Sequence, residues 1–219
     1  MAASSLDDLD LVVMTMANTI VDNADYFAQL DSIVGDGDFG YSLRSGWEVV
    51  LADYDSWDKP NAGAVCKKIG LTLAAKVGGV SGPMWGTAFL RAGATAGDQD
   101  LTPDLVIAML RAAIAGIMTR GGASLGDKTL LDALAPATDS LEESFKDPAT
   151  FEDHGVAAIQ RAADVAVQAA LDTKGMLALR GRAAYTGDRS RDSVDAGATA
   201  IGVILQAIAA AWRDKYGKQ

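Results

Sequence analysis

The chain has 219 residues, of which 49% are hydrophobic and only 6% aromatic, and its formal net charge at pH 7 is −10. This charge argues against nucleic acid as a partner, because nucleic-acid binding depends on lysine and arginine side chains that neutralise phosphates. The length predicts one domain, residues 1–219.

Several features predict a cytoplasmic protein without a membrane segment. The first residues, MAASSLDDLDLVV, are acidic where a signal peptide would be basic. Cys66 is the only cysteine, so an intrachain disulfide is impossible and a reducing compartment is favoured. The most apolar stretch, 196–212, is interrupted by polar residues, and we expect it to be too short to span a bilayer.

Composition and apolar spacing predict an all-α protein of about eight helices. Alanine is abundant, which favours packed helices over a sheet. Apolar residues recur at helical spacing in these stretches: 6–20 after an N-cap at Ser5, 23–33, 40–55, 61–77, a stretch through 89–90, 103–120, one following Asp127, 151–174 and 195–216. Alternate connections of an up-and-down bundle lie at the same end. We therefore expect an antiparallel bundle in which the connections near residues 35, 79, 121 and 190 form one site.

The stretch 31–40, DSIVGDGDFG, places three aspartates, Asp31, Asp36 and Asp38, in one glycine-rich turn. Carboxylates crowded in this way repel one another unless a cation lies between them. Mg²⁺ suits oxygen ligands and leaves coordination positions for phosphate oxygens. The alternative is an ordinary acidic surface turn, since Asp and Gly are the commonest turn formers.

Two further glycine-rich stretches have structural alternatives. Residues 78–87, GGVSGPMWGT, open a helix, but small residues there could simply let two helices approach closely. Residues 121–134, GGASLGDKTLLDAL, resemble a P-loop, but no strand precedes them. We expect Asp127 to cap the next helix and Lys128 to be solvated.

The fourth stretch, residues 181–197, contains Arg182, Arg189 and Arg191. Guanidinium groups in an acidic protein are candidates for binding phosphate. The alternative is a solvated loop in which these arginines pair with Asp188 and Asp192.

Together and in this order, the four motifs resemble the nucleotide-binding L subunit of bacterial dihydroxyacetone kinases. The motifs are Asp31-x4-Gly35-Asp36-Gly37-Asp38, GGVSGPMWGT, GDKTLLDAL and GRAAYTGDRS, and the resemblance covers nearly the whole chain. It implies an eight-helix antiparallel barrel that binds ADP or ATP and two Mg²⁺ ions at one end. It also implies that the three aspartates of the first motif are the metal ligands.

The resemblance further implies which residues bind the nucleotide. They are Phe39, Gly40, Tyr41 and Ser42 at a helix start, Val80 and Ser81 at the second glycine turn, Gly121 and Leu130 beside the adenine, and Arg182 at the phosphates, where it is also the candidate catalytic residue. A capping Asp-Pro-Gly of the family corresponds to Asp195, Ala196 and Gly197, so that Ala196 replaces the proline.

The implied function is that of a phosphoryl-donor subunit. Phosphate would pass from Mg-bound ATP, or from bound ADP recharged by a phosphotransferase-system phosphocarrier, to a ketose held by a separate K subunit. The family holds the ketose through a histidine, whereas the only histidine here, His154, lies outside all four motifs. Three alternatives stay open: a kinase for another short ketose such as erythrulose, a kinase acting without a partner, and a non-catalytic ADP-binding module. Whether the chain forms a homodimer also stays open.

Overall fold

The computed structural model describes residues 6–217, which form nine α-helices and three 3-10 helices without a β-strand. The predicted all-α class is therefore confirmed. The α-helices are α1 (Leu6–Asp22), α2 (Ala24–Ser32), α3 (Phe39–Asp53), α4 (Ala62–Lys76), α5 (Ser81–Ala96), α6 (Pro103–Gly121), α7 (Leu131–Phe145), α8 (Val156–Asp172) and α9 (Ala196–Tyr216). The 3-10 helices are η1 (Tyr54–Ser56), η2 (Pro148–Asp153) and η3 (Arg182–Asp192). The proposed N-cap Ser5 lies outside the described residues.

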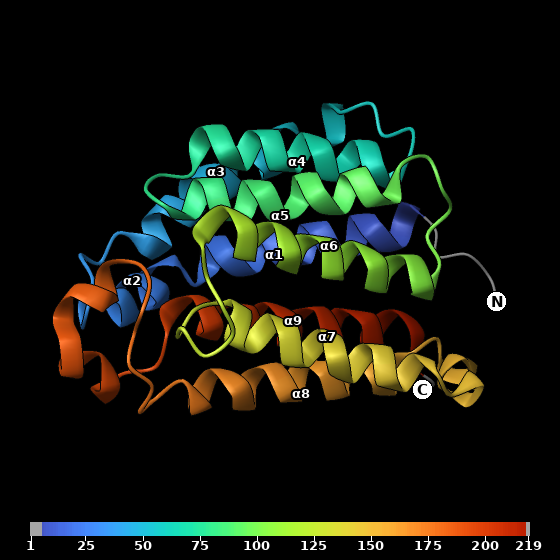
Figure 1. The fold of residues 1–219 in the computed structure, drawn as a ribbon. Coiled ribbons are helices and arrows are strands. Elements are labelled where there is room, and N and C mark those ends of the chain that lie inside the picture. Colours follow the sequence, from blue (N-terminus) through green and yellow to red (C-terminus); the bar gives the residue numbers. More distant parts are fainter. Residues whose placement is uncertain (1–5, 218–219) are drawn as a thin grey trace.

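Eight long helices form a closed ring (Figure 1). α1 packs against α3, each helix from α3 to α8 packs against the next one, and α9 returns to pack against α1. Successive helices of the ring run in opposite directions, and the short α2 lies at one end between α1 and α3. The predicted eight-helix antiparallel arrangement is confirmed.

The interior of the ring is built from apolar residues at helical spacing. In α3, for example, Leu43, Trp47 and Val50 are fully buried, and their spacing places them on one face of the helix. The corresponding core residues of the flanking helices are Val13, Ala17 and Ile20 in α1, Val65, Ile69 and Leu73 in α4, and Ile201, Ile204 and Ile208 in α9. Seven of the eight long helices contribute buried apolar residues to this central core, whereas those of α6 belong to two smaller clusters.

Small residues bring α4 and α5 unusually close together. A Cβ at Gly70 in α4 would lie 2.9 Å from the carbonyl oxygen of Gly86 in α5, and a Cβ at Gly82 would lie 2.3 Å from that of Val77. Side chains at these positions would collide with main-chain atoms, which cannot move aside cheaply. The close-packing interpretation of the stretch 78–87 therefore holds for Gly82 and Gly86.

The four glycine-rich connections lie at the same end of the bundle, as expected (Figure 1). We call this end, formed by residues 33–38, 77–80, 122–130 and 173–195, the glycine-loop end. α4 and α6 begin at the opposite end, where Asn61 and Thr102 accept hydrogen bonds from the N–H groups of Ala64 and Leu105. α3 and α5 begin at the glycine-loop end, and neither receives a side-chain cap from its N-cap residue.

The helix predicted over 151–174 begins later than expected. Residues up to Asp153 form η2, and His154 and Gly155 have positive φ values of 56° and 77°. This left-handed pair turns the chain, so that α8 starts only at Val156. Apolar spacing does not reveal such a turn, because the left-handed conformation of a histidine is set by the backbone around it.

α9 has almost the bounds predicted from apolar spacing, 195–216, but the expectation that this stretch is too short to span a bilayer is wrong. With 21 residues, it is the one described helix that has the length and composition to cross a membrane. Its hydropathy is also that of a core helix, because it packs between α1 and α8 and contributes seven buried residues to the bundle.

Candidate functional site

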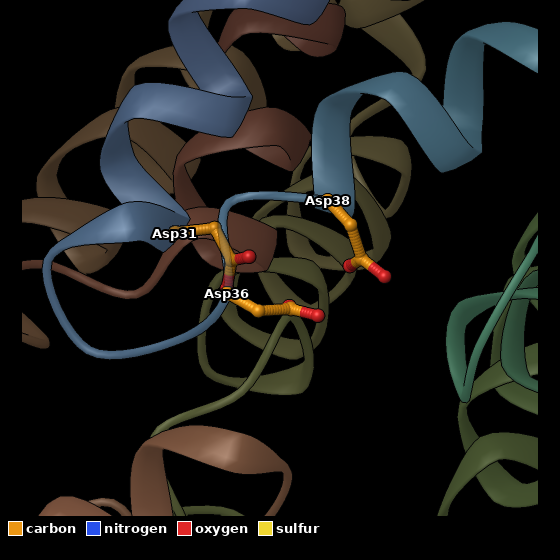
Figure 2. A group of neighbouring side chains, drawn as sticks. All are labelled: Asp31, Asp36 and Asp38. Atoms are coloured by element: carbon orange, nitrogen blue, oxygen red, sulfur yellow. The ribbon is translucent and has the colours of Figure 1, made fainter.

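The three aspartates of the first loop converge on one point (Figure 2). Asp31 belongs to the last turn of α2, Asp38 immediately precedes α3, and Asp36 lies between them. Carboxylate oxygens of all three lie within 4.8 Å of one another. The side chains of Asp36 and Asp38 are 36% and 50% exposed, so the cluster is open to solvent on one side.

The glycines of this loop are what allow the convergence. A Cβ at Gly35 would lie 2.2 Å from Oδ1 of Asp31, so a side chain there would displace the carboxylate. Gly37 has a φ of +74°, which places its N–H 2.8 Å from Oδ2 of Asp31. L-residues with a side chain rarely adopt this φ. The loop therefore holds Asp31 in place and aims its carboxylate at the other two.

The electrostatics of the cluster favour a cation. Partial burial and the negative charges of Asp36 and Asp31 raise the pKa of Asp38, whereas the Arg182 guanidinium lowers it. Three hard oxygen ligands this close, open on one side, fit a Mg²⁺ ion that keeps further positions for other ligands.

Of the three candidate arginines, the structure brings only Arg182 to the aspartates. Its guanidinium donates a hydrogen bond to Asp36, and its Nη2 lies 3.7 Å from Oδ2 of Asp38. Arg191 instead lies 3.4 Å from Asp188 and donates to the carbonyl of Gly175. The alternative of a locally paired loop is therefore correct for Arg191, and Arg189 is exposed.

The predicted phosphate-side residues adjoin the cluster. Phe39, Gly40, Tyr41 and Ser42 form the first turn of α3, directly after Asp38. A Cβ placed on Gly78 would lie 3.0 Å from Oγ of Ser42, which puts the second glycine turn, with Val80 and Ser81, beside this helix start. Gly40 itself is buried against the main chain of Ala24, which lets α2 pack closely on α3.

The predicted adenine-side residues lie further around the same end. Gly121 closes α6, and a Cβ there would lie 3.2 Å from the sulfur of Met84. Leu130 packs on the apolar cluster formed by α6 and α7, and its Cβ would be 3.2 Å from a Cβ on Gly197. Gly121 and Leu130 thus lie among apolar side chains at this end of the bundle. Asp195, in contrast, is a polar residue at the start of α9.

Asp195 is the N-cap of α9, and its Oδ2 accepts a hydrogen bond from the N–H of Ala198 at 2.7 Å. Burial raises the pKa of Asp195 to about 7; the N–H of Ala198 opposes this shift and the nearby Asp132 adds to it. The carboxyl group is therefore partly protonated near neutral pH, and ionising it costs stability as the pH rises through 7.

Ala196, which replaces the proline of the resembling family, occupies the first position of α9. Asp195 before it has φ −74° and ψ 129°, the extended conformation that a following proline requires. We predict that Ala196→Pro raises the free energy of unfolding by about 0.4–1 kcal/mol, because proline restricts the unfolded chain. Urea denaturation measures the effect. Ala198→Pro is the matched control, and it must destabilise because it removes the N–H that Asp195 caps; a loss of stability in both variants would contradict the prediction.

The third loop corrects the sequence analysis at two positions. Lys128 is not solvated, since only 2% of it is exposed and its Nζ donates to main-chain carbonyls of the 173–195 segment. Asp127 does not cap α7; its carboxylate accepts from the N–H of Ser124 and from Nε of Arg180 at 2.9 Å. Asp132, in the first turn of α7, accepts from the N–H groups of Gly126 and Thr129 and so ties the preceding loop to the start of the helix.

Comparison with known proteins places the chain in a family. Residues 33–210 match the family described as the DAK2 domain. The chain belongs to the DAK2 domain family. This DAK2 chain is 35% identical over 192 residues to the PEP-dependent dihydroxyacetone kinase, ADP-binding subunit DhaL, of Escherichia coli (strain K12). The aligned region covers 87% of this chain and 90% of the relative. It is 31% identical to the PTS-dependent dihydroxyacetone kinase, ADP-binding subunit DhaL, of Lactococcus lactis subsp. lactis (strain IL1403), over 86% of this chain and 88% of the relative.

Other relatives of the DAK2 chain are longer. It is 34% identical to the D-erythrulose kinase of Mycolicibacterium smegmatis, covering 89% of this chain but only 33% of that protein. Its fold matches the crystal structure of the dihydroxyacetone kinase from C. freundii in complex with AMP-PNP and Mg²⁺, with a TM-score of 0.73 and 25% identity over 96% of this chain and 35% of that one. The relatives are kinases or kinase subunits, which confirms the resemblance and the predicted class of enzyme.

Proposed function

We propose that this chain is the phosphoryl-donor subunit of a dihydroxyacetone kinase, binding Mg²⁺ with ADP or ATP at the glycine-loop end. The observation that carries the proposal is the convergence of Asp31, Asp36 and Asp38 on an open point that Arg182 reaches from another loop. The names of relatives support it, because several are ADP-binding subunits of dihydroxyacetone kinases and one structural neighbour contains AMP-PNP and Mg²⁺.

The chain supplies positioning and charge, which are the main requirements of phosphoryl transfer. The three aspartates would hold Mg²⁺, two ions in our proposal, and bound Mg²⁺ would neutralise the negative charge of the nucleotide phosphates. The uncapped first turns of α3 and α5 present main-chain N–H groups and the positive ends of their helix dipoles to an anion. Arg182 pairs with Asp36, and in our proposal it would meet the negative charge of a transferred phosphoryl group.

The ketose is expected to be held by another protein. His154, the one histidine of the chain, lies at the opposite end, where its ring stacks on Tyr216 at 4.7 Å and its carbonyl accepts from Trp212. It therefore cannot reach the aspartate cluster. We propose that a ketose-binding K subunit docks on the glycine-loop end, in the cytoplasm, and that nucleotide exchange or a phosphotransferase-system phosphocarrier restores the phosphoryl donor.

A second candidate is a kinase for a four-carbon ketose. The observation that favours it is the 34% identity to D-erythrulose kinase, of which this chain spans about a third. The nucleotide-binding machinery would be the same, and the ketose specificity would belong to the partner.

The experiment combines the purified chain, Mg-ATP and a K subunit with dihydroxyacetone or erythrulose, and measures sugar phosphate formation. We expect product only when both proteins are present, with Asp38→Asn as the inactive control. Product from this chain alone would show a stand-alone kinase instead. Tight ADP binding without transfer to either ketose would show a non-catalytic module.

A further inference from the structure

Lys128 is buried in the wall between the third and fourth loops. Its backbone has a φ of +62°, which few residues other than glycine adopt, and only 2% of the residue is exposed. Its Nζ donates hydrogen bonds to the main-chain carbonyls of Met176, Ser190 and Ser193, which are 48 to 65 residues away in the sequence. An ammonium group has three hydrogens, so these three carbonyls satisfy it completely.

The neighbouring Asp127 also binds residues of the 173–195 segment. Its carbonyl accepts from the N–H of Leu179 at 3.0 Å, and its carboxylate accepts from Nε of Arg180 at 2.9 Å. Asp127 and Lys128 therefore bind the chain on both sides of Arg182, which lies two residues after Arg180 and eight before Ser190. We call these two residues the clasp.

The segment that carries Arg182 is mostly exposed. It is joined to the stretch after α8 by hydrogen bonds between Gly175 and Arg191 and from the N–H of Ala178 to Ser190. Within Arg182–Asp192, only Ser190 is buried, and the left-handed Gly187 interrupts its 3-10 turns. The side chain of Arg182 is 57% exposed. A segment with so few buried contacts is expected to open locally unless other residues hold it. The contacts of the clasp join this segment to the loop that precedes α7.

We propose that Lys128 is a positioning residue for phosphoryl transfer, and that its ammonium group holds the Arg182 segment in the place where Arg182 meets the aspartate cluster. The proposal rests on the proposed function for its effect on transfer, but the fastening itself is a property of the free chain. Lys128 acts through Arg182 and need not touch the nucleotide.

The test compares Lys128→Met with Lys146→Met, which removes an exposed lysine that pairs with Glu143 at the opposite end of the bundle. In the free protein, trypsin cleavage after Arg182, Arg189 and Arg191, identified by mass spectrometry, should accelerate about tenfold in Lys128→Met and stay unchanged in the control. In the reconstituted kinase, kcat should fall about 10²-fold, as expected when a catalytic group is misplaced by about 1 Å, while the Kd for Mg-nucleotide changes by less than about threefold.

A double-mutant cycle separates positioning from loss of folding. If Lys128 acts through Arg182, adding Lys128→Met to Arg182→Ala causes no further loss of kcat. Independent losses that multiply in the double mutant would overturn the proposal, as would wild-type cleavage kinetics in Lys128→Met. If Lys128→Met does not fold, Arg180→Met, which weakens the clasp at a half-exposed position, must show the same pattern at smaller amplitude. Faster cleavage without any transferase activity of the wild type would leave the clasp standing and reject the proposed function.

Discussion

Replacing Asp38 with asparagine is expected to stabilise the empty protein and to remove most of the stabilisation that Mg-nucleotide confers. The negative charges of Asp36 and Asp31 oppose ionisation of Asp38, so a neutral side chain relieves repulsion when no cation is present. With ligand, the loss of one carboxylate should weaken nucleotide affinity at least about tenfold, the lower limit seen when even outer partners of a metal site are removed. At a hundredfold excess over Kd, the wild type gains about 2.7 kcal/mol, and the variant should lose about half of that gain or more.

The pH dependence of this effect has a defined sign. Because the pKa of Asp38 is raised in the folded protein, its contribution to stability is fully present below the unfolded-state pKa of about 3.9 and is lost as the pH rises through the folded-state pKa. The advantage of Asp38→Asn in the empty protein should therefore grow as the pH rises from about 4 to 7.

Thermal denaturation with and without Mg-ADP measures both effects. Asp98→Asn, at an exposed aspartate in the connection between α5 and α6 at the opposite end, is the matched control and should show neither. EDTA should make the wild type behave like Asp38→Asn towards nucleotide. An undiminished nucleotide-dependent shift of Tm in Asp38→Asn would refute the metal interpretation of the loop.

Arg182→Ala is expected to lower kcat by about 10²–10³-fold, the range found when a group that stabilises transition-state charge is removed. The nucleotide Kd should rise only a fewfold, because in the proposed complex the aspartates and the start of α3, on other elements, would provide the remaining contacts. In the empty protein the lost ion pair to Asp36 should cost little stability, since both side chains are substantially exposed.

Kinetics of the reconstituted kinase, together with direct titration of Mg-nucleotide, distinguish the two effects. Arg189→Ala is the matched control, because this arginine belongs to the same exposed segment, whereas Arg182 is the one that pairs with the aspartates. If Arg182→Ala raised Kd and left kcat unchanged, Arg182 would be a ground-state ligand of the phosphates and would have no catalytic role.

The local chemistry of the sequence was sufficient to predict most helices. Asn61 and Thr102 cap α4 and α6 through hydrogen bonds to residues three positions later, and the apolar stripes repeat within single helices. The gathering of the four loops follows from the up-and-down order of the helices alone. The aspartate cluster was also predictable, because its three members and the required glycines lie within one short stretch.

The third loop was not predictable in this way. Asp127 and Lys128 look like a cap and a solvated neighbour because their partners, from Met176 to Ser193, are about fifty residues or more away. The backbone of Lys128 also adopts a conformation that its residue type disfavours, so propensity points away from the observed structure. One signal in the sequence could have indicated the buried lysine. Lys128 lies in a glycine-rich turn that is not a P-loop, so its positive charge needed another binding partner.

The uncapped starts of α3 and α5 would link ligand supply to the lifetime of the protein. The starts of α4 and α6 are closed by the protein's own side chains, whereas those of α3 and α5 are left for something else to satisfy. In the empty protein, the helix starts at that end, including the loop between α2 and α3, would open locally. Proteases would cleave the opened chain there. If nucleotide fills these helix starts as proposed, degradation of the empty protein would be faster than that of the nucleotide-bound protein.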